Sequence, residues 1–93
     1  MLNRILPMKE LEKILKALAN KRRLAILKYL KTRNEASVGE IAYEIKLSFK
    51  ATSKHLAILH ACDILEKDQR SLQMFYRVTN PSAPTVKHIV SLF

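Results

Sequence analysis

Hydroxyl, ammonium and imidazole groups gather at the start of residues 47–60, LSFKATSKHLAILH, whose second half is mostly aliphatic. In a helix of about 3.6 residues per turn, part of this segment and its flank form one apolar face. The residues on that face are Ala51, Thr52, Leu56, Ile58, Leu59 and Cys62. We expect this face to rest on a core, which leaves the polar side chains outward. There they can donate hydrogen bonds to base edges and phosphates in the major groove of DNA.

Five polar residues of this segment are the predicted DNA contacts. We assign Lys50, Ser53 and His55 to base edges, and Ser48 and Lys54 to phosphates. The dipole of the helix start also favours nearby anions. The alternative is a plain solvated face, since two lysines on a helix need no ligand.

Other chemistries have little support in the sequence. Cys62 is the single cysteine, so it cannot form an internal disulfide, and we interpret it as a core side chain rather than a redox switch. His88 has no acidic partner within its predicted helix, and zinc prefers about four N, S or O ligands. The chain has one glycine, no phosphate-binding loop and no nucleophile beside an obvious base. We therefore expect no metal, no cofactor and no enzyme activity.

Two short helices joined by a tight turn are predicted around this segment. Ser37-Val38-Gly39-Glu40 matches the capping box that starts a helix, and this helix is expected to run through Ile45. Ser48 is a second N-cap candidate only three residues later. Helices so closely spaced form a helix-turn-helix.

Helices and a hairpin are predicted on either side of this motif. Periodicity places helices at 8–19, 21–32 and 84–93 and strands at 64–67 and 73–79. The expected hairpin tip is 68–71, where Arg70 is best placed to reach the DNA backbone or minor groove. Lys67 is a further predicted contact, although Lys67 and Arg77 are equally interpreted as strand residues facing water. The sequence thus predicts one domain, residues 1–93, mainly α with a small β-hairpin: a winged helix-turn-helix of order α-α-α-α-β-β-α.

The charge and hydropathy of the chain are consistent with a nucleic-acid partner. Seventeen Lys and Arg against eight Asp and Glu give a net charge of +9, which favours polyanions. Apolar runs are far shorter than the roughly 20 residues that cross a bilayer. The start, MLNRILPMKEL, lacks the features of a secretory signal. We expect a cytoplasmic protein without membrane contact.

Three segments in order carry a family resemblance: KALANKRRLAIL (16–27), SVGEIAYEIKLSFKATSKHLAILHACDIL (37–65) and QMFYRV (73–78). Together they resemble the ArsR/SmtB-type winged-helix repressors of bacteria and archaea. The resemblance implies a homodimer paired through its first and last helices, which binds an operator and often releases it on a signal. The implied interface residues are Leu11, Ile14, Leu15, Leu18, Val86, Ile89, Val90 and Phe93. The alternative for these side chains is packing within one monomer.

The predicted function is a sequence-specific DNA-binding transcriptional regulator, taken to be a repressor, that binds double-stranded DNA as a homodimer. Two recognition helices about 34 Å apart predict an inverted-repeat operator with half-sites one DNA turn apart. Two alternatives stay open. One is a winged helix that serves protein contact in a transcription or nucleoprotein assembly. The other is a repressor that responds to a metal or ligand.

Three turns depart from the glycine-rich pattern of this family. The chain has Lys46 before the recognition helix, Asp63 after it, and Gln69 or Arg70 at the wing tip. A lysine is disfavoured in the left-handed conformation. The turn at Lys46 is therefore expected either to adopt another geometry or to store strain.

Overall fold

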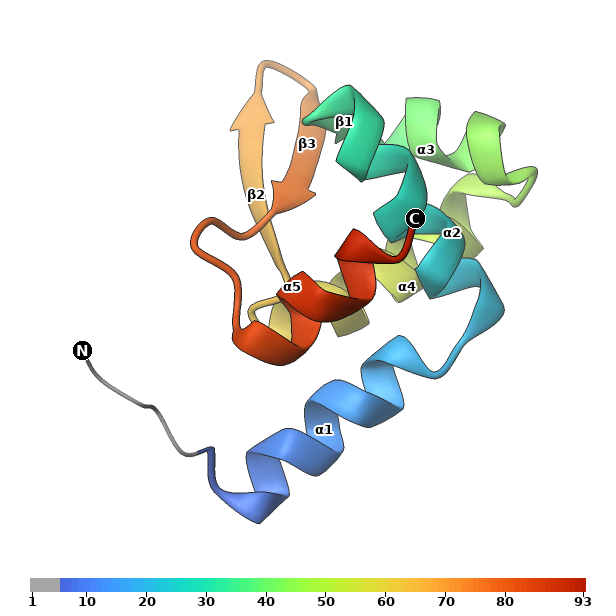
Figure 1. Cartoon of the computed structure of the whole chain (residues 1–93). Helices are drawn as coiled ribbons and strands as arrows, with labels where there is room; N and C mark the ends of the chain where they lie inside the picture. Colours follow the sequence, from blue (N-terminus) through green and yellow to red (C-terminus); the bar gives the residue numbers. More distant parts are fainter. Residues whose placement is uncertain (1–5) are drawn as a thin grey trace.

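The computed structural model describes residues 6–93; the first five residues of the segment searched for a secretory signal lie outside them. The described helices are α1 (Met8–Leu18), α2 (Lys21–Arg33), α3 (Val38–Ile45), α4 (Phe49–Ala61) and α5 (Pro84–Ser91). The strands are β1 (Ala36–Ser37), β2 (Leu65–Arg70) and β3 (Gln73–Val78). The order agrees with the predicted winged helix-turn-helix, with β1 added. Figure 1 shows α1 along the lower edge, with the β2–β3 hairpin and α3 at the opposite end of the molecule.

The sheet is antiparallel in the order β1-β3-β2, and β1 was not predicted from the sequence. Ala36 lies opposite Tyr76, and Leu65 lies opposite Val78. A strand of two residues leaves no alternating pattern, so only pairing with β3 identifies it. The wing tip was placed wrongly: β2 continues to Arg70, and the turn lies at Ser71 and Leu72.

The core lies where α2, α3, α4 and the start of the wing meet. Fully buried side chains include Ile26 and Leu27 of α2, Ile41 of α3, and Leu56 and Leu59 of α4. They belong to one hydrophobic cluster that also takes in the buried ends of β2 and α5. Burial of this aliphatic face holds α4 against the body and leaves its other face outward.

Ile58 lies outside the core, although its apolar side chain and its place on the helix predicted burial. Its side chain is 42% exposed, whereas Leu56 and Leu59 on either side of it are completely buried. Ile58 precedes Leu59 by one residue, about 100° around the helix, which places it at the edge of the buried arc. Its apolar character alone did not determine its direction.

Three of the eight predicted interface residues are buried within the chain itself. Ile14, Leu18 and Val86 belong to the core cluster, so these three side chains pack within the monomer and expose little surface to a second copy. Leu15 remains 48% exposed, and Phe93 remains 39% exposed. The partly buried Leu11, Ile89 and Val90 also retain surface. Pairing between copies would therefore depend on these five.

Candidate nucleic-acid interface

The turn between α3 and α4 sets the direction of the recognition helix, α4. Lys46 has φ 56° and ψ 52°, which is the left-handed conformation, so the turn stores strain rather than adopting another geometry. The penalty for a non-glycine residue there is about 1 kcal/mol. The amide of the next residue, Leu47, donates to the carbonyl of Ala42 at 3.0 Å. The Ser48 hydroxyl then caps α4 by accepting from the amide of Ala51 at 3.1 Å.

The outward face of α4 carries two lysines that are free to contact an anion. Lys50 and Lys54 are exposed, and neither forms an ion pair with any residue from 6 to 93. Ser53 lies between them and is partly buried. Thr52 is completely buried, so it packs against the core. The first turns of α4 thus present cations beside the positive end of the helix dipole, as a phosphate-binding surface requires.

His55 is placed differently from the other predicted DNA contacts. Its Nδ1 atom lies 3.1 Å from Nη1 of Arg23, a residue of α2. One side of its ring is therefore held inside the protein. Arg23 is not among the residues predicted for the site, because 32 residues separate it from His55 in the sequence. The only signal was that both residues occur in the motifs of the family resemblance.

Arg70 is held by carboxylates of the protein rather than presented at the wing tip. Its guanidinium donates to both carboxylate oxygens of Glu35, at 2.6 and 2.8 Å, and to Asp68 at 3.0 Å. It also lies 4.5 Å from the centre of the Phe75 ring. The hydrogen bond from Arg70 lowers the pKa of Glu35, and the bonds to Glu35 and Asp68 raise the pKa of Arg70. Arg70 therefore ties the wing to the segment before β1.

The two other wing cations, Arg77 and Lys67, differ in whether a carboxylate balances their charge. Arg77 donates to Glu66 at 2.9 Å across the β2–β3 pair, so its charge is also balanced within the wing. Lys67 is exposed and has no ion pair in the described chain. Lys67 is consequently the wing cation best available to a phosphate.

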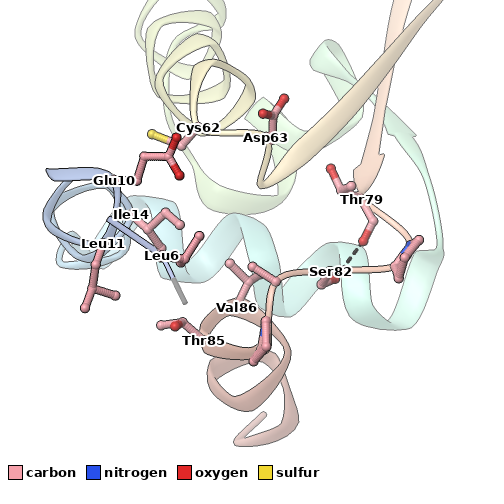
Figure 2. A pocket seen from close by; sticks show the side chains of 13 residues that line it. Leu6, Glu10, Leu11, Ile14, Cys62, Asp63, Thr79, Ser82, Thr85 and Val86 are labelled. Atoms are coloured by element: carbon pink, nitrogen blue, oxygen red, sulfur yellow. Dashed lines mark hydrogen bonds between the residues drawn. The ribbon is translucent and has the colours of Figure 1, made fainter. Parts of the chain in front are cut away.

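A groove of about 650 Å³ lies on another face, between the start of α1, the end of α4 and the loop before α5. Figure 2 shows apolar side chains such as Leu6 and Val86 along it, with Glu10, Cys62 and Asp63 at one end. Cys62 packs against the core but is only partly buried, so the expectation of a core thiol holds in part. Between residues 6 and 93, no three His, Cys, Asp or Glu side chains come together as metal ligands. None of the helices in that range is both long and apolar enough to span a bilayer.

A family model supports the same assignment of motifs. Residues 20–67 match the model described as bacterial regulatory protein, arsR family. The matched range contains α2, α3, α4 and the start of β2. It therefore includes Arg23, Lys50, Lys54 and His55.

Two individual relatives are similar to this chain over most of its length. The transcriptional activator HlyU of Vibrio cholerae is 39% identical over 79 residues, which are 85% of this chain and 69% of HlyU. The solved structure of HlyU superposes with a TM-score of 0.77 at 37% identity, and the match covers 90% of this chain and 87% of that one. The transcriptional repressor PagR of Bacillus anthracis gives a TM-score of 0.76 at 26% identity, covering 91% and 93%.

A third structure adds the oligomeric state of a relative. It is the homodimeric winged helix-turn-helix DNA-binding domain Mb0332 of Mycobacterium bovis, solved by NMR. Its TM-score is 0.77 at 27% identity, and the match covers 91% of this chain and 75% of that one.

Proposed function

This chain belongs to the arsR family of bacterial regulatory proteins, and from that premise we propose that it represses transcription as a homodimer on an inverted-repeat operator. It is a winged helix-turn-helix DNA-binding regulator. The observation that carries the proposal is the pair of exposed lysines on the first turns of α4, Lys50 and Lys54, which form no ion pair within residues 6–93. Ser48 and Lys54 contact phosphates, and Lys50 and Ser53 contact base edges, with Lys67 on the wing. The proposal includes a cytoplasmic location and no metal, cofactor or catalytic activity.

Selection of bound sequences from a random pool of duplex DNA tests this function. We expect an inverted repeat with half-sites one turn apart. With about four phosphates neutralised by each protomer, log K against log salt should slope at roughly −7. A flat salt dependence would contradict the phosphate contacts, and a single asymmetric half-site would contradict the dimer.

The proposed homodimer uses the apolar outer faces of α1 and α5. A shallow hollow on α1 is lined by Met8, Leu11 and Leu15 together with Ala19. On α5, Ile89, Val90 and Phe93 retain surface. The variant Leu15→Arg should shift the chain to a monomer in sedimentation equilibrium while its circular dichroism is unchanged. A dimer that survives both Leu15→Arg and Val90→Arg would overturn this pairing.

Repression is the proposed sign of regulation, although the relatives differ in this respect. HlyU is named an activator and PagR a repressor. A reporter whose promoter overlaps the selected inverted repeat should lose expression when the protein is supplied. A gain of expression would reverse the sign and leave DNA binding intact.

Two exposed aromatic residues favour protein contact as a second candidate function. Tyr43 of α3 is 87% exposed and Phe49 at the start of α4 is 63% exposed. Aromatic residues are enriched at protein interfaces. Under this alternative the DNA selection would return no sequence preference, and binding to random duplex would persist only at low salt.

A further inference from the structure

The side chain of Arg23 joins three helices through one guanidinium group. Its Nε atom donates to the carbonyl of Ala17 at 2.6 Å, and Nη2 donates to that of Lys16 at 3.3 Å, both near the end of α1. Its Nη1 atom lies 3.1 Å from Nδ1 of His55 on α4. The backbone of Arg23 is itself fixed, since its amide donates to the N-cap Asn20 at 3.1 Å.

This contact determines which ring nitrogen of His55 carries the proton. A guanidinium can only donate, so Nδ1 of His55 must accept, and the proton of the neutral ring lies on Nε2. Burial lowers the pKa of His55, and the charges of Arg23 and Arg22 lower it further. Among residues 6–93, no carboxylate is hydrogen-bonded to His55 to oppose this shift. The imidazole is therefore neutral at pH 7 and keeps a single donor.

We propose that Arg23 is a positioning residue that sets the rotation of the recognition helix through His55. The proposal rests on the proposed DNA binding by α4. His55 directly follows Lys54 and lies two residues from Ser53, so a bond that fixes its ring also fixes the directions of both neighbours. A helix held only by aliphatic packing keeps some freedom to rotate, whereas a hydrogen bond of defined direction restricts it.

Arg23 also couples α4 to α1. The carbonyls of Lys16 and Ala17 lie in the last turn of α1, where helical carbonyls lack amide partners, and Arg23 supplies donors to them. A displacement of α1 is thus transmitted to the ring of His55. Because α1 forms part of the proposed dimer surface, pairing of two copies and the orientation of α4 are linked through this residue.

A pair of charge-conserving variants tests the bridge. Arg23→Lys retains the charge but replaces the planar fork by one ammonium, which cannot reach α1 and His55 in the same geometry. We expect it to weaken binding to the selected operator about tenfold while the salt slope stays unchanged, because no phosphate contact is lost. The matched control is Arg22→Lys, since the Arg22 side chain forms no hydrogen bond or ion pair with the described residues. It should stay within twofold of wild type.

Two replacements of His55 separate positioning from base contact, and they leave the bonds of Arg23 to α1 in place. His55→Asn puts an oxygen near the position of Nδ1 and removes the Nε2 donor, whereas His55→Gln keeps a donor near Nε2 and removes the acceptor. If His55 serves to position the helix, His55→Asn should keep its operator affinity within threefold of wild type, and His55→Gln should lose about tenfold. The reverse order would make His55 a base contact and overturn the proposal.

Nitrogen-15 NMR of the histidine rings gives a readout that needs no DNA. Wild type should show His55 as the Nε2–H tautomer at pH 7.5, and Arg23→Lys should show a mixture of tautomers with Arg22→Lys unchanged. A wild-type Nδ1–H tautomer would exclude the bridge. If wild type selects no operator, the proposed function fails; if Arg23→Lys binds an operator as tightly as wild type, only the positioning role fails.

Discussion

The recognition helix and the wing are both basic, but their charges are used differently. On α4, Lys50 and Lys54 point outward with no ion pair in the described chain. On the wing, Arg70 is held by Glu35 and Asp68, and Arg77 by Glu66. An arginine already bound to two carboxylates must give up those bonds before it can serve a phosphate, so its net contribution to DNA affinity is small.

The difference assigns separate tasks to the two regions. Under the proposed function, the recognition helix offers free charge and hydrogen-bond donors to DNA, and Arg23 holds its orientation. The wing then offers Lys67 to DNA, while Arg70 and Arg77 form ion pairs within the protein. The tip itself presents Leu72, which is 96% exposed, rather than a cation. The number of basic residues in a segment is therefore a poor measure of the charge it offers to DNA.

The largest expected difference between the regions is in DNA affinity. Lys54→Ala should weaken binding to all sequences about tenfold at moderate salt and reduce the salt slope by about one for each protomer. Arg77→Ala is the matched wing variant and should cost less than threefold. Fluorescence anisotropy at several salt concentrations measures both. If both variants lost DNA affinity equally, the charge of Arg77 would be as available to DNA as that of Lys54.

Sequence preference should change at one position of the recognition helix. Lys50→Ala should relax the preference at one base pair of each half-site, whereas Lys54→Ala keeps the wild-type motif. Repeating the selection with each variant measures this. An identical motif for Lys50→Ala and wild type would move Lys50 from the bases to the phosphates.

Removal of the ion pairs of Arg70 is expected to have a smaller effect on operator affinity. Arg70→Met and Glu35→Gln should each lower operator affinity two- to threefold, because both loosen the wing. Neither should change the salt slope by more than a few tenths. If Glu35→Gln instead strengthened binding, the released Arg70 would be a DNA contact, as the sequence alone indicated.

The two regions should also lose stability in different pH ranges. The pKa of His55 is lowered by burial and by Arg23, so its contribution is complete above about pH 6.5 and is lost as pH falls through the lowered pKa. The pKa of Glu35 is lowered by its bond to Arg70, so its contribution is complete above about pH 4.5 and is lost at lower pH. Urea unfolding at pH 7.5, 5.5 and 3.5 measures the free energy of unfolding. Between pH 7.5 and 5.5 this free energy should decrease less for His55→Asn than for wild type. Between pH 5.5 and 3.5 it should decrease less for Glu35→Gln than for wild type. Glu44→Gln, at an exposed residue without an ion pair in the described chain, is the control.

The smallest effect is predicted on the inner face of α4. The hydroxyl of Thr52 is buried and has no hydrogen-bond partner among residues 6–93. Thr52→Val removes that hydroxyl and should be neutral or stabilise the fold by about 1 kcal/mol or less. Operator affinity should stay within twofold, as measured beside a thermal melt. A clear loss of affinity would mean that Thr52 helps to orient the outer face.

Local signals in the sequence were sufficient to predict the order of the main helices and the residues at which these helices begin. Ser37 and Ser48 cap the helices that they were predicted to cap, and the Ser37–Glu40 capping box is present in both directions. Asn20 caps α2 in the same local way. The partners in each cap lie two or three residues apart, so the chemistry of a cap is complete within one short stretch. The apolar period similarly placed Thr52, Leu56 and Leu59 on the buried face of α4.

Contacts between distant residues were decided only by the tertiary structure. No local pattern in the sequence pairs Arg23 with His55 or Glu35 with Arg70, and the predicted wing tip lies too early in the chain. It also could not tell which apolar side chains of α1 and α5 face inward. Helical period and capping depend on residues within about one turn, whereas ion pairs, two-residue strands and exposed edges depend on which segments fold against each other. The sequence therefore determined that this is a DNA-binding winged helix-turn-helix with a polar helix start, and the packing determined which of its cations remain free for DNA.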